Sequence, residues 1–309
     1  MKILFVSPDP RPERWIQLLE SALPDADWVV WHPELPHQDA DYALVWQPPE
    51  ILFKKEPQLK AIFNLGAGVD ALLKLSKLPK TLPIYRLEDA GMSAQMAEYL
   101  VHQVAEITRV MTIYRQQQQQ KVWRMQAPCR RHEWPIGFLG MGQIAQKSAQ
   151  ALALLEYPVA SWSRSKKALT GIESYAGEDQ LTAFVQRSRI LINTLPLTSE
   201  THSFLNQRLF DQMPEKSVLI NVGRGQHLNE MDLLNALEYG KLSHAVLDVF
   251  SEEPLPSSHP FWSHAKITLT PHISAPTLRE ETVRQITDKL QRIAKREEVS
   301  GRVDRERGY

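Results

Sequence analysis

The sequence predicts an α/β protein built from two doubly wound parallel-sheet domains, with an active site in the cleft between them. Length is the first reason, because a chain of 309 residues that is 43% hydrophobic exceeds the usual size of one such domain. The second reason is that short apolar runs bounded by turn residues alternate with helix-like segments, and this alternation occurs in two separate series.

The first series predicts an N-terminal parallel sheet. Its strands are expected at residues 3–6, 28–31, 42–46 and 59–63. From residue 92 to about 125 the chain has no Pro or Gly and is rich in Ala, Met, Gln, Glu and Arg, which predicts one long helix that joins the two halves. The amphipathic stretch 276–297 is expected to form a helix that returns to the first domain.

The second series begins after Pro135. Its strands are expected at residues 136–139, 159–162, 190–194, 218–222, 245–249 and 267–270, with a helix over 143–155. We therefore expect a substrate-binding domain from residues 1–100 and 275–309, and a dinucleotide-binding domain from residues 101–274. The charged tail 298–309 has too few apolar residues to pack alone, so it is expected either to be disordered or to serve a subunit contact.

Composition limits the class of partner. Acidic and basic residues balance at 36 each, so no net field draws the protein towards nucleic acid or an anionic membrane, and a small-molecule partner is favoured. The short apolar opening runs into Pro and charge and is interpreted as a strand, no stretch is long enough for a membrane helix, and Cys129 is the only cysteine. We expect a soluble, disulfide-free cytoplasmic protein.

A glycine loop opens the second series. Gly140-Met-Gly142-Gln-Ile-Ala145 follows a predicted strand and opens a predicted helix, the context typical of a Rossmann-like dinucleotide-binding domain. Glycine allows the tight turn and the close approach of pyrophosphate to the backbone at the helix N-terminus. An ordinary strand-to-helix turn is the alternative. Cofactor contacts are expected from the loop residues Gly140, Met141, Gly142, Gln143 and Ile144.

The end of the next strand predicts which nicotinamide cofactor is used. An NAD-binding domain places an Asp or Glu there to hold the ribose, whereas this chain has Ser163-Arg164-Ser165 followed by two lysines. An acid would repel the 2′-phosphate of NADPH, and Arg offers planar donors that match phosphate oxygens. These three residues therefore favour NADPH over NADH, with a solvated basic turn as the alternative.

Arg224, Glu253 and His272 follow in order, each at or just after the end of a predicted strand, which is the sheet edge where α/β proteins bind ligands. Reducing a 2-keto acid requires a cation for the carboxylate and a proton donor for the carbonyl oxygen, and Arg224 and His272 supply these. Glu253 beside the imidazole would favour its protonated form. Taken singly, the three have plain alternatives as a turn cation, a solvated acid and a loop histidine.

The remaining histidines of this half lack that combination of a strand end and a preceding proline. They are expected to be surface or packing residues, and no compact ligand spacing among histidines and acids predicts a zinc site. This group is His202, His227, His244, His259 and His264.

Four ordered motifs together resemble those of the D-isomer-specific 2-hydroxyacid dehydrogenases. They are G-x-G-x-x-A, then N-x-x-R-G, then D-x-F-x-x-E-P, then P-H. The resemblance extends over nearly the whole chain and implies Arg224, Glu253 and His272 as the catalytic set. Within the family the chain is most similar to the NADPH-dependent glyoxylate and hydroxypyruvate reductases of type A, because of Ser163-Arg164 and the early glycine loop 64–70. A homodimer is implied as well.

The resemblance implies further binding residues. The backbone amides of Ala67 and Gly68 would hold the substrate carboxylate, although a plain glycine-rich turn is the alternative. Trp46 would wall a pocket for two- or three-carbon substrates, or else belong to the core. Additional cofactor contacts are implied for Leu195, Pro196, Leu197, Val222 and Asp248. After His272 the chain has Ile-Ser-Ala where many relatives have Ile-Gly-Gly, which puts the pocket shape in doubt.

Two other functions remain open at this point. Relatives of this fold act as nucleotide-sensing co-repressors, and a binding module of that kind is the alternative from another class. The second alternative is a dehydrogenase of the same fold for another substrate, such as phosphite, formate or a bulky keto acid. The predicted long helix, with Trp123 near its end, is expected either to be a dimerisation arm or to be simply exposed.

Overall fold

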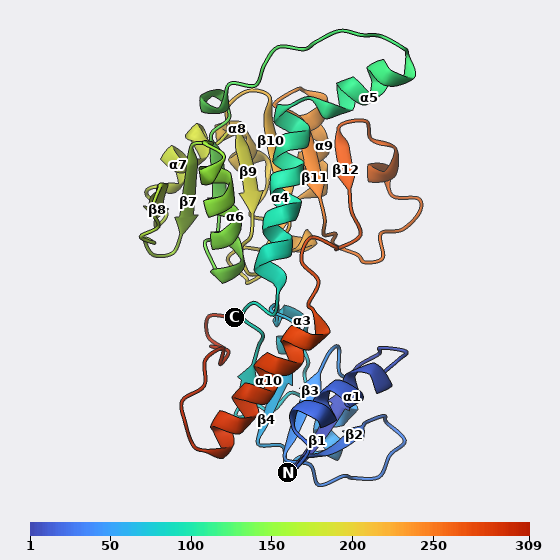
Figure 1. The fold of residues 1–309 in the computed structure, drawn as a ribbon. Helices are drawn as coiled ribbons and strands as arrows, with labels where there is room; N and C mark the ends of the chain where they lie inside the picture. The colour runs from blue at the N-terminus through green and yellow to red at the C-terminus, as the bar shows by residue number, and fades with distance from the viewer. The chain divides into compact units, whose positions relative to one another are not determined.

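A computed structural model describes residues 1–309, and the chain divides into two compact units (Figure 1). Unit 1 consists of Met1–Gly91 and Thr277–Tyr309, and unit 2 consists of Met92–Pro276. Both contain a parallel sheet, which confirms the predicted fold class. None of the helices combines the length and apolar character needed to cross a membrane.

Unit 1 contains a five-stranded parallel sheet in the order β2-β1-β3-β4-β5. The interior strand β1, which lies between β2 and β3, is buried from its second residue onward, as expected for a strand covered on both faces. The strands are β1 Lys2–Val6, β2 Asp27–Val30, β3 Tyr42–Val45, β4 Ala61–Asn64 and β5 Ile84–Tyr85, and the helices are α1 Glu13–Ala22, α2 Ile51–Lys55, α3 Asp70–Leu73 and α10 Arg279–Ala294.

The C-terminal segment is an ordered part of unit 1. Helix α10 packs beside α1 (Figure 1). Beyond it, Arg302 forms an antiparallel bridge to Tyr85, Val303 is buried, and the Arg305 guanidinium donates to the carbonyl of Leu82 at 2.7 Å. The tail therefore packs through backbone pairing and one apolar side chain, an arrangement that its composition did not reveal.

Unit 2 contains a seven-stranded parallel sheet in the order β12-β11-β10-β9-β6-β7-β8. Strand β6 pairs with β9 on one side and β7 on the other, so the strand order reverses at β6, and ligands of such sheets bind outside the strand ends at this reversal. The strands are β6 Ile136–Leu139, β7 Val159–Ser163, β8 Ile172–Ala176, β9 Ile190–Asn193, β10 Ser217–Asn221, β11 Leu242–Leu247 and β12 Ile267–Leu269.

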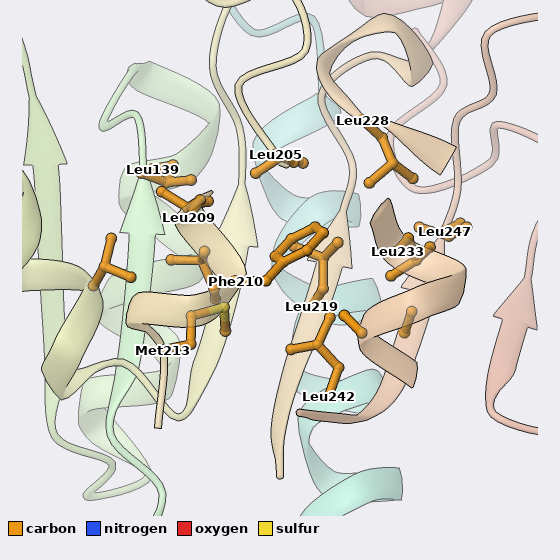
Figure 2. Close-up of a cluster of buried hydrophobic side chains, with 14 of the residues drawn as sticks. Leu139, Leu205, Leu209, Phe210, Met213, Leu219, Leu228, Leu233, Leu242 and Leu247 are labelled. Atoms are coloured by element: carbon orange, nitrogen blue, oxygen red, sulfur yellow. The ribbon is translucent and has the colours of Figure 1, made fainter. Parts of the chain in front are cut away.

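Helices cover both faces of this sheet. Helices α4 and α6 pack side by side on one face (Figure 1). Alternate residues of one strand point to opposite faces, so in β10 Val218 joins the α4 and α6 cluster while Leu219 joins the cluster under α8 and α9 (Figure 2). The helices are α4 Met92–Thr108, α5 Met111–Gln119, α6 Gln143–Leu154, α7 Leu181–Arg187, α8 Gln207–Gln212 and α9 Glu230–Glu238.

The prediction of one long helix from residue 92 to 125 is wrong. Helix α4 ends at Thr108, Val110 has a left-handed backbone with φ of 49°, and α5 runs only from Met111 to Gln119. The Thr108 hydroxyl is 2.8 Å from both the Val104 carbonyl and the Tyr157 hydroxyl, so the end of α4 is fixed by a tertiary contact. No Gly or Pro marks the break, so the amino-acid pattern alone could not predict it.

Candidate active site

His272 lies in the loop that follows β12 and has an unusual backbone. Its φ is 53°, a left-handed conformation that costs a non-glycine residue free energy and is found at functional sites when the surroundings enforce it. The His272 amide donates to the carbonyl of Asp248 at 2.9 Å and to that of Thr270 at 3.0 Å. These two hydrogen bonds hold the backbone of His272 in a conformation that a non-glycine residue would not otherwise favour.

The carboxylate of Asp248 also fixes this loop. It is fully buried at the end of β11, and its two oxygens accept the amides of Ile273 and Ser274, both at 2.9 Å. The Thr270 hydroxyl donates to the same carboxylate at 2.6 Å. The carboxylate of Asp248, which was predicted to line the cofactor side, is thus directed to the backbone that follows His272 and to the Thr270 hydroxyl that precedes it.

Tyr99 of α4 extends this network. Since the Thr270 hydroxyl donates to Asp248, it accepts from the Tyr99 hydroxyl, whose oxygen is 2.7 Å away. Burial, with a contribution from the charge of Asp248, raises the pKa of Tyr99 to about 12, so its hydroxyl keeps its proton and remains a donor. Tyr99 was not predicted as a site residue, because no local sequence pattern connects a helix residue with a distant strand end.

Glu253 orients the His272 ring. Its carboxylate lies 2.8 Å from Nδ1 of His272, and its other oxygen accepts the Phe250 amide at 2.9 Å. Partial burial raises the pKa of Glu253, but the bonds from His272 and Phe250 and the charge of Arg224 outweigh it, and the pKa falls below its usual range. Glu253 is therefore ionised at neutral pH, and Nε2 is the ring nitrogen left for proton transfer.

Arg224 follows β10, in a loop held by two glycines. A Cβ on Gly225 would lie 1.8 Å from the carbonyl carbon of Phe250, so only glycine fits beneath that strand-end loop. The Arg224 side chain donates to the carbonyl of Gly223 at 2.8 Å, and its charge acts on Glu253. Arg224, Glu253 and His272 all belong to unit 2 and follow the three neighbouring strands β10, β11 and β12.

The glycine loop has the features of a dinucleotide cradle. Gly140 has φ of 91°, and a Cβ there would press on the Thr194 carbonyl at 3.0 Å. A Cβ on Gly142 would meet nothing within 4 Å, which leaves open space at the N-terminus of the twelve-residue helix α6. Ala145 is buried between that helix and the sheet. The predicted strand, loop and helix of this motif are confirmed.

The end of β7 carries the residues predicted to select the cofactor. Arg164 lies 3.5 Å from Glu200, and more than half of both side chains is exposed. The Ser163 hydroxyl donates to the carbonyl of Ser165 at 2.8 Å. No carboxylate lies on the strand end itself, so this turn is compatible with a phosphate group.

Other predicted cofactor residues lie at neighbouring strand ends. Leu195 and Val222 are buried in the two core clusters, and Pro196 follows Leu195 in the loop after β9. Met141 is buried as well. Because the side chains of Met141, Leu195 and Val222 are all buried, these residues would contact a ligand mainly through their backbone.

The predicted substrate residues of unit 1 lie after β3 and β4. The Asn64 amide donates to the carbonyls of Gly66 and Gly68, both at 2.9 Å, and so fixes the loop that carries Ala67. Trp46 is 39% exposed, which excludes a purely core position. A Cβ added to Gly66 would lie only 2.4 Å from the nearest atom of the Trp46 ring. The glycine is needed because the indole packs on the loop.

Comparison with known proteins decides the family. Residues 101–274 match the family model described as D-isomer specific 2-hydroxyacid dehydrogenase, NAD binding domain. The chain belongs to this family. Two relatives named glyoxylate/hydroxypyruvate reductase A, from Yersinia enterocolitica and Salmonella paratyphi B, are 45% and 43% identical, with all of both chains covered in each case.

Solved structures of D-isomer-specific 2-hydroxyacid dehydrogenases agree over the whole chain. One from Xanthobacter autotrophicus Py2, in complex with NADPH and MES, has a TM-score of 0.92 and 34% identity. An NADPH-dependent glyoxylate/hydroxypyruvate reductase from Sinorhizobium meliloti, in complex with NADP and sulfate, has a TM-score of 0.93 and 31% identity. Each covers 100% of this chain and 99% of the other. The predicted family is therefore confirmed.

Proposed function

We propose that this dehydrogenase is an NADPH-dependent reductase of small 2-keto acids, converting glyoxylate to glycolate and hydroxypyruvate to D-glycerate. The observation that carries the proposal is the pairing of His272 with an ionised Glu253 at 2.8 Å, with the charge of Arg224 acting on the same carboxylate. The names of the full-length relatives from Yersinia and Salmonella support the choice of keto acid.

The residues of unit 2 fit NADPH. The open space at Gly142, at the start of α6, would receive the pyrophosphate, and Ser163, Arg164 and Ser165 would hold the 2′-phosphate. Further contacts are assigned to the loop after β9 and to the ends of β10 and β11. NADPH, when bound, supplies the hydride that the keto carbon accepts. The full set proposed is Gly140, Met141, Gly142, Gln143, Ile144, Ser163, Arg164, Ser165, Leu195, Pro196, Val222 and Asp248.

The catalytic roles follow from charge and geometry. The Arg224 guanidinium binds the substrate carboxylate and polarises the adjacent carbonyl. As the carbonyl oxygen gains negative charge, Nε2 of His272 gives it a proton and the imidazole becomes neutral. Glu253 keeps the ring oriented through Nδ1 and favours its protonated form before each turnover.

Unit 1 is assigned to substrate recognition. Ala67 and Gly68 would offer backbone amides to the substrate carboxylate, in a loop that Asn64 holds in shape. Trp46, exposed and packed on Gly66, would limit the length of the substrate chain. A bulky keto acid would then be excluded by the indole, whereas two- and three-carbon acids would fit.

We further infer a homodimer formed through the arm of residues 111–130. After α5 the chain runs as a long loop that arches over unit 2 and returns to the sheet at β6 (Figure 1). Trp123 is fully exposed and Met125 is 86% exposed, and large apolar side chains gathered in this way are typical of association surfaces.

A substrate panel tests the proposed function. Purified protein is assayed with NADPH and with NADH against glyoxylate, hydroxypyruvate, pyruvate and a branched keto acid. We expect the highest kcat/KM for glyoxylate or hydroxypyruvate with NADPH. Higher kcat/KM for the branched acid, or nucleotide binding without any turnover, would contradict the proposal, and the latter would favour a nucleotide-sensing module.

A further inference from the structure

Three fully buried polar side chains lie beneath the loop of Arg224. Asn193 ends β9, Asn221 ends β10, and His227 closes the short 3-10 helix Gly225–His227; none is exposed at all. Buried polar groups cost free energy unless hydrogen bonds compensate them, so these side chains need hydrogen-bond partners among one another and in the surrounding backbone. His227 had been expected to be a surface or packing residue, and its burial in a polar cluster calls for another account.

Backbone amides fix the orientation of both asparagines. The Leu195 amide donates to Oδ1 of Asn193 at 3.2 Å, and the Gly223 amide donates to Oδ1 of Asn221 at 3.2 Å. Since a backbone N–H can only donate, these oxygens are assigned and the two Nδ2 groups must point the other way. Nδ2 of Asn193 then donates to Oδ1 of Asn221 at 2.9 Å and also faces His227 at 2.9 Å.

The same reasoning fixes the protonation of His227. Its Nδ1 accepts the Arg224 amide at 3.0 Å and Nδ2 of Asn193 at 2.9 Å. A nitrogen that accepts two donors carries no hydrogen, so the ring proton is on Nε2, which faces the Pro196 carbonyl at 3.3 Å. The imidazole is thus a neutral linker with an acceptor towards Arg224 and a donor towards Pro196.

We propose that His227 is a positioning residue for this reductase: through Nδ1 it sets the backbone of Arg224, and through Nε2 it sets the loop of Pro196. The first contact acts on keto-acid binding and the second on the nicotinamide side, so the inference rests on the proposed function of those two residues. Gly223 packs directly against the side chains of Asn193 and His227, since a Cβ there would be 2.8 Å from Nδ2 of Asn193 and 3.0 Å from Nδ1 of His227. The loop has no room to move towards the network.

Two substitutions separate the two contacts. His227→Asn places an amide oxygen near the position of Nδ1 and keeps an acceptor for the Arg224 amide, but it is too short to reach Pro196. His227→Gln places an amide nitrogen near the position of Nε2 and keeps a donor for Pro196, but it offers no acceptor to Arg224. His244, half-buried and 2.9 Å from the Thr268 hydroxyl, provides matched control variants far from Arg224 in the sequence.

The expected result is a crossed pattern. His227→Gln should lower kcat/KM for glyoxylate by roughly tenfold, the effect of one buried hydrogen bond, with the Kd for NADPH within about twofold of wild type. His227→Asn should weaken NADPH binding by roughly tenfold and keep most of the kcat/KM at saturating NADPH. The same changes at His244 should alter neither parameter.

Both variants are expected to lose a similar amount of Tm, which a purely structural role would also cause. If both parameters fall together in each variant, in proportion to the loss of Tm, His227 is only structural and the proposal is overturned. It is equally overturned if neither parameter changes.

A measurement without substitution keeps the inference testable should the variants fold poorly. The nitrogen chemical shifts of the His227 ring in wild-type protein should show a proton on Nε2 alone, whereas a proton on Nδ1 would overturn the proposal. This result and the Kd for NADPH do not depend on turnover. If wild-type protein reduced no keto acid, the proposed function would fail on its own while these two readouts still decided the role of His227.

Discussion

His272 shows how a strained residue is held in place for chemistry. A left-handed backbone at a non-glycine residue costs on the order of 1–3 kcal/mol. The Asp248 carboxylate offsets this cost because it accepts the two amides that follow His272 and the Thr270 hydroxyl. The ring is fixed separately by Glu253, so the backbone and the side chain of the proposed proton donor are each held by one carboxylate.

Charge on Glu253 should determine the alkaline limit of keto-acid reduction. Its pKa is lowered, so it is ionised throughout the neutral range and places a negative charge 2.8 Å from the His272 ring. Glu253→Gln removes that charge, which favours a protonated proton donor, so the falling limb of kcat/KM should move towards acid. The measurement is kcat/KM for glyoxylate against pH.

Glu252→Gln is the matched control for this prediction, because Glu252 is the exposed neighbour of the same type. Its pH profile should follow that of wild type. A limb that moves in Glu252→Gln and stays in place in Glu253→Gln would contradict the assigned pairing.

At this scale the sequence predicted the residues with a local signature. Arg224, Glu253 and His272 could be placed at one sheet edge because each follows a strand end within an ordered motif, and parallel strands bring their ends to one edge. Tyr99 and His227 could not be found in this way. Their roles depend on hydrogen bonds to Thr270 and to Asn193 that only the folded chain brings within reach.

At the scale of elements, strands buried on both faces were the most predictable. Continuous apolar runs predicted β6, β9 and β10, which are fully buried. Strands β8 and β5 were not predicted. Strand β8 lies at the sheet edge with only Ile172 buried, and β5 has two residues, so neither carries a clear hydrophobic pattern.

The end of β7 should determine cofactor choice. Ser163→Asp combined with Arg164→Ala supplies a ribose acceptor and removes the partner of the 2′-phosphate, so the ratio of kcat/KM with NADPH to that with NADH should fall by at least roughly tenfold. The ratio is measured with glyoxylate held constant.

Lys167→Ala is the control for this double variant, since Lys167 is an exposed cation of the same turn. It should leave the cofactor ratio near that of wild type. If Lys167→Ala lowers the ratio as much as the double variant does, the general charge of the turn, and not Arg164, selects the cofactor.

For the whole molecule, composition and motif order predicted two α/β units but not their finer organisation. Unit 2 begins at Met92, before the expected boundary at residue 101, because α4 packs against α6 through Met96, Leu100 and Val104. Composition alone also did not predict whether the C-terminal tail, residues 298–309, is ordered. Its pairing with Tyr85 uses backbone groups, which every sequence possesses and no composition reveals.

The oligomeric state should depend on the exposed arm. Replacing Trp123 and Met125 together by Ser removes the apolar surface of the arm, and we expect wild-type protein to sediment at twice the chain mass and the variant to dissociate at a concentration at least roughly tenfold higher. Leu154→Ser is the control, because Leu154 is 84% exposed on a different helix. Dissociation in the control, or a monomeric wild type, would be inconsistent with a dimer through this arm.

The central claim is that His272 donates the proton in an NADPH-dependent reduction, and His272→Ala tests it most directly. The measurement pairs kcat for glyoxylate reduction with the Kd for NADPH, determined by fluorescence titration. We expect kcat to fall by roughly 10²–10⁴-fold while the Kd stays near wild type, because His272 would act in chemistry and not in cofactor binding. An unchanged kcat in His272→Ala would show that His272 is not the proton donor.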